Sequence, residues 1–446
     1  MKYANLALTC FALALMACSG STQFPEPTGK GTFRAINAIS TSPNINFRLE
    51  EVSGQRILPM SYREMTASSR FDDFEYDFNF EVRFPGVLQE TRVATVTQKI
   101  EANKDYTFVA TGSVESPTIL TWVGDERSFE PEDTVAEVRI AHLAESVGSA
   151  DFYFAPVGAA PTLGEADGTL AFGEFIPPQD VEAGDYVLTV TAPGDPSTIL
   201  FQSVVVTYAT QTAATVAIFD GTADDTAPIS GRGLVTIGGS SFTINDARFP
   251  STLRFIQASE PLDTVDIYSD EALTNQVVAA LPYAGTSAEI EVEDGEQAYF
   301  FTPAGTTGAI VFQTAVVPSR GQRFEHYSIG ETGEFLGVSG TRDTQPIEIY
   351  PTLAVTNMLF NEQIVEVYVV EPGESIEDVI PRFSALYGFV SGRLPIVAGC
   401  YDVIVTANDS KSPIGSTRID VANGDVARFT LFATADPNVI EILPQP

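Results

Sequence analysis

The sequence is poor in the side chains on which most enzyme chemistry depends. Its 446 residues include three cysteines, two histidines and one tryptophan. The histidines, His142 and His326, are far apart in the chain, which does not favour a catalytic triad or a zinc site, since each needs several converging groups. The motifs G-x-S-x-G, C-x-x-C, H-E-x-x-H and the phosphate-binding loop do not occur. We therefore expect no enzyme activity, no catalytic residue, no metal site and no cofactor.

Positive charge is scarce as well. Lys and Arg number 24 against 59 Asp and Glu, which gives a formal net charge of −35. Nucleic acid binding is disfavoured, because proteins contact phosphates with Lys and Arg that displace counterions. Flat binding to anionic lipid is disfavoured for the same reason. The acidic composition instead predicts a soluble surface that resists self-association.

Long apolar runs are also rare, and the run at the N-terminus is short. Lys2 precedes an apolar run over residues 6–17, and small residues end it. This order of charge, apolar run and small residues is typical of an export signal, and the run is too short to span a bilayer. We expect residues 1–17 to be a signal peptide.

The end of this signal resembles the lipobox of bacterial lipoproteins in four consecutive residues: Leu15, Met16, Ala17 and Cys18. The resemblance implies that the signal peptidase recognises the first three and that Cys18 becomes the lipid-bearing N-terminus of the mature chain. Ser19, rather than Asp, follows the cysteine, and in that family this implies sorting to the outer membrane. An ordinary secretory signal that contains Cys18 is the alternative.

The segment after the signal predicts a lipidated cysteine and a flexible tether over residues 18–31. Residues 19–31 are rich in Ser, Thr, Pro and Gly and show no apolar periodicity. Cys10 leaves with the signal and Cys18 carries lipid, so no intramolecular disulfide is expected. Cys400 lies in a strand pattern and is predicted to be a small, buried apolar residue.

What the sequence does contain is a fourfold repeat. A strand–turn–strand pattern at residues 138–154 recurs at residues 33–49, 253–269 and 353–369. Each repeat continues with short stretches rich in Val, Thr and aromatics, punctuated by Gly and Pro, to roughly seven strands. A propeller blade needs only about 40 to 45 residues, fewer than the repeat offers. The fold class predicted is therefore all-β, a tandem array of four immunoglobulin-like antiparallel β-sandwich domains.

The repeat also fixes equivalent positions and domain limits. The equivalent residues, which follow one another at roughly 100 to 115 residues, are Arg34, Arg139, Arg254 and Ala354. Polar stretches rich in Gly, Asp or Thr separate the repeats. The four predicted sandwich domains are residues 32–130, 131–245, 246–345 and 346–446.

The repeats resemble a known family. The second repeat has VRIAH at residues 138–142 and ADFYF at residues 150–154, and the third has ASEP at 258–261 and VDIY at 265–268. These segments resemble the bacterial domain of unknown function 4397. The resemblance implies exported or surface proteins, often with tandem copies, and transfers no catalytic residues. It also implies that His142 forms a hydrogen bond within the turn after the first strand.

Two acidic stretches are candidate sites. Residues 74–84 alternate apolar and polar side chains without error, as in a half-buried strand. The acidic residues beside and within this run are Asp72, Asp73, Glu75 and Asp77. Calcium takes several oxygen ligands, but the last two acids fall on the wet face of the strand, which favours a solvated surface. Residues 220–225 form a second acidic loop, between units, where calcium binding is an alternative.

These features together predict a non-catalytic, lipid-anchored cell-envelope protein, a semi-flexible β-sandwich rod for adhesion, scaffolding or binding. The expected partners are the membrane, through the N-terminal lipid, and an unknown protein or polysaccharide, but no nucleic acid. The expected location is the outer membrane, facing the periplasm or the cell surface. Two alternatives stay open. One is a carboxylate-dependent hydrolase of envelope or extracellular polymers, and the other is a calcium-stiffened binding protein.

Overall fold

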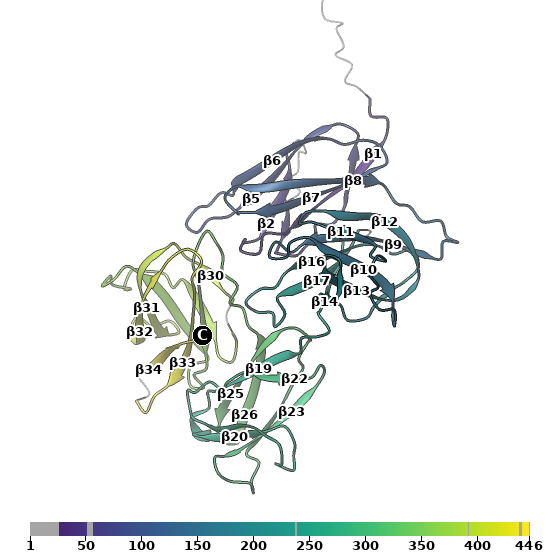
Figure 1. Cartoon of the computed structure of the whole chain (residues 1–446). Coiled ribbons are helices and arrows are strands. Elements are labelled where there is room, and N and C mark those ends of the chain that lie inside the picture. The colour runs from purple at the N-terminus through teal and green to yellow at the C-terminus, as the bar shows by residue number, and fades with distance from the viewer. Residues whose placement is uncertain (1–25, 51–56, 237–238, 391, 437–438, 446) are drawn as a thin grey trace, which may run out of the picture.

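The computed structural model describes residues 26–50, 57–236, 239–390, 392–436 and 439–445. Strands in this part of the chain form eight sheets, which face one another in pairs to give four units (Figure 1). The helical structure among the same residues is one 3-10 turn, η1 (Glu260–Leu262). The predicted all-β fold of repeated sandwiches is therefore confirmed. No helix in the described ranges has the length and apolarity that crossing a bilayer demands.

The first two units span residues 30–125 and 135–244. Unit 1 contains β1 (Lys30–Asn37), β2 (Ile45–Leu49), β3 (Ile57–Met60), β4 (Ser69–Asp72), β5 (Glu75–Val82), β6 (Thr91–Lys99), β7 (Lys104–Gly112) and β8 (Pro117–Asp125). Unit 2 contains β9 (Val135–Leu143), β10 (Ala150–Pro156), β11 (Gly168–Leu170), β12 (Phe175–Glu182), β13 (Gly184–Ala192), β14 (Asp195–Gln202), β15 (Val206–Tyr208), β16 (Ala213–Asp220), β17 (Ile229–Val235) and β18 (Ser241–Ile244).

The last two units span residues 251–341 and 352–444. Unit 3 contains β19 (Ser251–Gln257), β20 (Val265–Tyr268), β21 (Gln276–Leu281), β22 (Ile290–Val292), β23 (Gln297–Pro303), β24 (Phe312–Val316), β25 (Arg323–Glu331) and β26 (Glu334–Thr341). Unit 4 contains β27 (Thr352–Asn357), β28 (Ile364–Val370), β29 (Phe383–Leu386), β30 (Leu394–Pro395), β31 (Gly399–Ala407), β32 (Pro413–Val421), β33 (Val426–Ala433) and β34 (Ile440–Pro444).

All four units share one core topology, to which unit 2 adds β15 and β18. In unit 1 the two sheets have the orders β4-β1-β7-β8 and β3-β2-β5-β6, and unit 3 repeats this as β22-β19-β25-β26 and β21-β20-β23-β24. The first strand of each unit runs parallel to its neighbour β7, β16, β25 or β33, and the other pairings of named strands in the described chain are antiparallel. The first and second strands of each unit belong to different sheets and do not pair with each other. The repeated strand–turn–strand segment therefore connects the two sheets of the sandwich.

Strand β5 shows how the alternating sequence builds a core. Tyr76, Phe78, Phe80 and Val82 point inward and are buried. The ring of Phe78 stacks on that of Phe47 from the same sheet, with centroids 5.7 Å apart. Burying apolar surface contributes about 25 cal/mol per Å², and each unit has its own cluster of this kind. The predicted alternation is confirmed for the apolar face of β5, but Asn79 and Glu81 on the opposite face are buried as well, so that face is not wet along the whole strand.

Two further apolar clusters join units in pairs. One contains Ile36 and Trp122 from unit 1 and Phe219 from unit 2. The other contains Tyr327 from unit 3 and Phe432 from unit 4. In each unit, the residues of these clusters come mainly from the sheet that contains the unit's first strand. They lie on the face of that sheet that is turned away from the unit's own core. Units 1 and 2, and likewise units 3 and 4, therefore pack sheet against sheet.

The single tryptophan lies in the contact between units 1 and 2. The indole Nε1 of Trp122 donates to the carbonyl oxygen of Gly173 at 3.1 Å, and its ring lies 5.0 Å from that of Phe175. Gly173 has a φ of +84°, and a Cβ atom there would come within 2.7 Å of the Leu120 side chain. Glycine is needed at this contact for both reasons.

The predicted tether reaches into unit 1. The backbone N–H of Thr28 donates to Asp73 Oδ1 at 2.8 Å, and the Asp73 N–H donates to the Gly29 carbonyl oxygen at 3.1 Å. Strand β1 then begins at Lys30. The predicted signal peptide, residues 1–17, lies outside the described residues, as does Cys18 with the tether up to residue 25.

Candidate functional site

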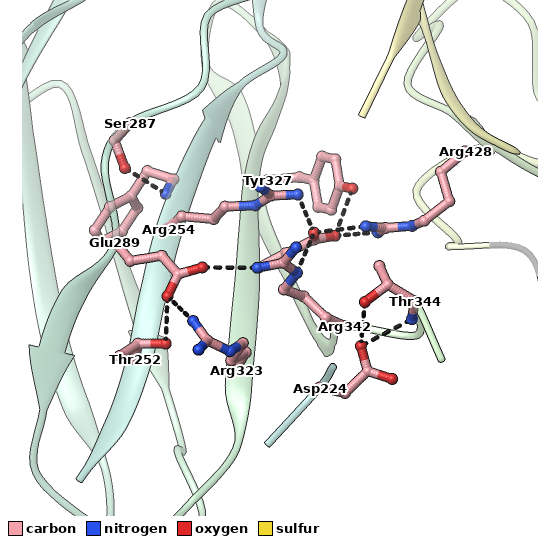
Figure 2. Close-up of polar contacts among 12 residues, drawn as sticks. Asp224, Thr252, Arg254, Ser287, Glu289, Arg323, Tyr327, Arg342, Thr344 and Arg428 are labelled. Atoms are coloured by element: carbon pink, nitrogen blue, oxygen red, sulfur yellow. Dashed lines mark hydrogen bonds and ion pairs between the residues drawn. The ribbon is translucent and has the colours of Figure 1, made fainter. Parts of the chain in front are cut away.

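A buried carboxylate lies at the contact between units 3 and 4 (Figure 2). Glu325, on β25, is 2% exposed. Its Oε1 accepts from Arg254 Nη2 at 2.5 Å and from Arg428 Nη1 at 3.0 Å, while its Oε2 accepts from Arg428 Nη2 at 2.5 Å and from the Tyr327 hydroxyl at 3.1 Å. Arg254 belongs to unit 3 and Arg428 to unit 4. One carboxylate therefore ties the two units together.

This carboxylate stays ionised although it is enclosed. Burial by itself raises the pKa of Glu325, but hydrogen bonds and charge from Arg428 and Arg254 outweigh burial and hold the pKa below its usual range. Arg342 adds a third guanidinium, with its Nε 3.8 Å from Glu325 Oε1. With four donors and almost no exposed surface, the carboxylate has a structural role in this contact.

The arginines marked by the repeat lie in these contacts. Arg34 of unit 1 donates through Nη1 and Nη2 to the carboxylate of Asp105, at 2.7 and 2.6 Å. Arg139 of unit 2 approaches the same carboxylate to 3.9 Å. In unit 4 the equivalent Ala354 lies opposite Arg428 in the β27–β33 ladder. In unit 4 the arginine that contacts unit 3 is therefore Arg428 on β33, the strand next to the equivalent position.

The acidic loop between β16 and β17 links unit 2 to the other units. Asp225 pairs with Arg63 of unit 1, Nη2 to Oδ2, at 2.7 Å. Asp224 Oδ1 accepts from the N–H and the hydroxyl of Thr344 at 2.8 and 2.7 Å (Figure 2). Asp220 accepts from two backbone N–H groups of unit 2, at 2.8 and 3.0 Å. The carboxylates considered for calcium thus have protein donors. Within the described residues, no group of three or more His, Cys, Asp or Glu gathers as a metal site.

The connection between units 3 and 4 packs back onto unit 1. The Glu348 N–H donates to the Thr41 carbonyl oxygen at 2.8 Å. The Glu348 carboxylate accepts from the Ser113 hydroxyl at 2.8 Å and from the Val114 N–H at 3.2 Å. Tyr350 and two neighbouring isoleucines join the core cluster of unit 1. The chain thus returns to its first unit before the fourth begins.

A cleft of about 1050 Å³ lies where these parts meet. Unit 1 lines it with residues 40–46 and with the connection at residues 83–90. The connection at 343–350 and residues 393–395 of unit 4 line it too, together with Arg232 of unit 2. The cleft therefore depends on the way the units are assembled, since no single unit provides all its walls.

The cleft is lined by five arginines, although acids outnumber bases by 59 to 24 in the whole chain: Arg63, Arg83, Arg232, Arg382 and Arg393. The first pairs with Asp225 and the last with Asp343, each at 2.7 Å. The other three have no carboxylate within 4.0 Å among the residues that the structure describes. The result is a local surplus of positive charge.

The carboxylates of the same cleft do not cancel this surplus. Glu90 accepts from the Asn46 amide at 2.6 Å, and Asp224 accepts from Thr344. Asp343 is the partner of Arg393. Each acid lining the cleft is thus already engaged, and three guanidinium groups remain for another anion.

The two histidines have separate structural positions. His142 Nε2 lies 2.7 Å from the Gly148 carbonyl oxygen, which confirms the predicted hydrogen bond within the turn. His326 Nδ1 lies 2.7 Å from the Ser339 hydroxyl oxygen in unit 3. Burial lowers the pKa of both, that of His326 to about 3. The structure does not bring them together.

The prediction for Cys400 was wrong, because this residue is exposed. It lies on β31, where Val403 and Val405 face the core, so the twofold period places it on the other face. The pattern was read correctly as a strand but assigned the wrong face. A hydrogen bond with Asp420, opposite Cys400 in the ladder, raises the pKa of the thiol.

The acids near β5 are distributed along a surface. Asp73 is held by Thr28 and Gly29, and Asp77 accepts from the Thr97 hydroxyl at 2.5 Å. Glu75 is exposed, as predicted for the wet face. The structure therefore does not gather these acids, and the arginine-lined cleft was missed because its residues have no equivalent spacing in the repeats.

Fold and cleft together define a tandem β-sandwich protein with a cleft between units. Residues 31–153 match the model of the family described as "Domain of unknown function (DUF4397)". The match begins in β1 and ends in β10, so it covers unit 1 and the opening strands of unit 2. The resemblance predicted from the sequence is confirmed over this range.

Among solved structures, the chain is similar to one described as "The Bacillus anthracis TIE protein". The two are 11% identical, with 87% of this chain and 68% of that chain covered, and the TM-score is 0.16. A score this low carries no argument about fold or function. No curated protein matches the sequence.

Proposed function

We propose that the protein is a non-catalytic binding and scaffolding protein of the cell envelope, attached to the outer membrane by lipid on Cys18. The observation that carries this proposal is the joining of four sandwiches through buried ion pairs, with an open cleft at their junction. Glu325, His142 and His326 are buried in structural contacts, whereas Arg83 and Arg382 are exposed and line a cleft. Such an arrangement suits holding a partner.

The contacts between units also suit a scaffold. Sheet faces packed with apolar and ion-paired side chains resist hinge motion more than a bare linker does. Glu325 and Asp105 each bridge arginines of two units, and Asp225 ties unit 2 to unit 1. A partner bound at one unit would therefore be held at a fixed position relative to the others.

The anchor is tested by changing the predicted lipid-bearing residue. Cys18→Ser should move the protein from the outer-membrane fraction to the soluble fraction, because one thioether is the attachment point. Ser19→Ala keeps the cysteine and is the matched control. Antibody labelling of cells with and without a permeabilised outer membrane then distinguishes the cell surface from the periplasm. Membrane recovery of Cys18→Ser equal to that of the control would overturn the anchor.

The binding role is tested with isolated envelope material. Purified full-length protein should co-sediment with envelope fragments that carry their polysaccharide, and it should release no reducing sugar from them. Retention by no fragment would overturn the binding role. Release of sugar that Asp73→Asn or Asp77→Asn abolishes would instead support the hydrolase.

A further inference from the structure

The arginine-lined cleft can be assigned a ligand class. Resting on the binding role proposed above, we infer that this cleft binds an acidic oligosaccharide, with its carboxylate or sulfate groups on the arginines and its hydroxyls on the polar wall. The ligand bridges units 1 and 4, since Arg83 belongs to the first and Arg382 to the fourth.

The arginines have unused donors. Arg83 is exposed and donates through Nη2 to the Leu88 carbonyl oxygen at 3.1 Å. The Arg382 guanidinium is exposed and has no hydrogen bond or ion pair within the described chain. Arg232, on the unit 2 wall, is half-buried and donates through Nη1 to the Thr243 hydroxyl. A guanidinium presents a planar fork that matches carboxylate and sulfate, so these donors fit an anion.

Repulsion between Arg63 and Arg232 also favours an anion in the cleft. Arg232 has no carboxylate partner, and burial together with the charge of Arg63 lowers its pKa. A bound anion offsets the repulsion, because it supplies opposite charge where two guanidinium groups approach each other. The net charge of −35 repels anions over the rest of the molecule, which restricts such binding to this cleft.

The remaining lining favours a saccharide over a simple ion. Hydroxyl and amide side chains suited to sugar hydroxyls line the unit 1 and unit 2 walls: Ser40, Ser42, Asn44, Asn46, Ser61 and Thr222. Pro59, Phe84 and Pro85 line the cleft beside them. About 1050 Å³ is at the upper end of ordinary ligand sites, which is far more than one inorganic anion needs and enough for several sugar residues.

The test is titration calorimetry on the full-length protein with defined probes. Tetragalacturonate carries carboxylates, and a chondroitin sulfate tetrasaccharide also carries sulfates. At least one should bind, with affinity that falls as salt rises. Maltotetraose, which is neutral, should not bind. The two acidic probes show which acid group the cleft prefers.

Two exposed arginines provide the variants. Arg83→Gln and Arg382→Gln should each weaken the acidic probe by about tenfold or more, because each removes a charged donor. Arg418→Gln is the matched control, since Arg418 is exposed, lies on β32 outside the cleft lining and pairs with Asp402. Thermal unfolding of all three should match the wild type.

Other outcomes overturn the inference in different ways. Equal or tighter binding of tetraglutamate would make the ligand an acidic peptide, and binding of inorganic phosphate alone would make it a simple ion. Binding of neither acidic tetrasaccharide, or equal affinities in Arg382→Gln and the control, would remove the saccharide from this cleft. Co-sedimentation with envelope fragments would then still support the binding role, so the two failures are distinguishable.

Discussion

Glu325 shows how a single side chain couples two units. It receives hydrogen bonds from Arg254 in its own unit and from Arg428 in the next, at 2.5 to 3.0 Å. Two buried guanidinium groups form ion pairs with it. The sequence identified Arg254 as a repeated position, but it gave no signal for Glu325, because acids are frequent throughout the chain. The repeat therefore identifies the arginine, whereas its carboxylate partner is determined by the fold.

Glu325→Gln should destabilise the protein by about 3 to 5 kcal/mol at neutral pH, because it removes the buried carboxylate that Arg254 and Arg428 share. The pKa of Glu325 is below 4.5, so its contribution is present above about pH 4.5 and is lost as pH falls through its folded value. The difference between wild type and variant should therefore shrink on acidification. Urea unfolding across pH measures both effects.

The control for this change is Glu334→Gln, which alters an exposed carboxylate on the neighbouring strand β26. It should change stability by less than about 0.5 kcal/mol. A loss for Glu325→Gln no larger than this, or one independent of pH below 4.5, would contradict the proposed role of the buried carboxylate.

At the scale of strands, the sequence predicts much of the fold. The twofold alternation located β5, and the repeat located the first two strands of each unit. Alternation states which residues share a face, but it does not state which strands pair or which face is buried, as Cys400 illustrates. The parallel pairing of β1 with β7 joins segments about 70 residues apart, and no local pattern encodes it.

Phe219, on β16, tests the contact between the paired sheets. It is fully buried in the cluster shared by units 1 and 2. Phe219→Ala should cost about 3 to 5 kcal/mol and leave a cavity. It should also shift the fluorescence of Trp122, the single tryptophan, to longer wavelength, because water gains access to the indole. Denaturant unfolding followed by this emission measures both.

Phe389→Ala is the matched control, since Phe389 is 65% exposed in unit 4. Its emission maximum and unfolding midpoint should match those of the wild type. An unchanged Trp122 spectrum in Phe219→Ala would mean that the two sheets do not enclose the indole in solution.

At the scale of the whole molecule, the units do more than follow one another. They pair through their sheets, and the connection before unit 4 returns to unit 1 (Figure 1). The arginine cleft exists because of this return. The repeat predicts how many units there are, but the contacts that close the cleft include single loop residues such as Asp224 and Glu348, which have no equivalents at the repeat spacing. The cleft could therefore not be predicted from the sequence.

The most direct test of this assembly is a cross-link between Thr41 and Glu348, whose backbones share a hydrogen bond of 2.8 Å across 307 positions of sequence. Thr41→Cys and Glu348→Cys are combined in a background in which Cys10, Cys18 and Cys400 are all changed to Ser, and each single-cysteine variant is the control. Mild oxidation should link most molecules and change their migration on a non-reducing gel, since the two positions are close enough for a disulfide. Two thiols that stay reactive, with no link formed, would contradict the return of the chain to unit 1.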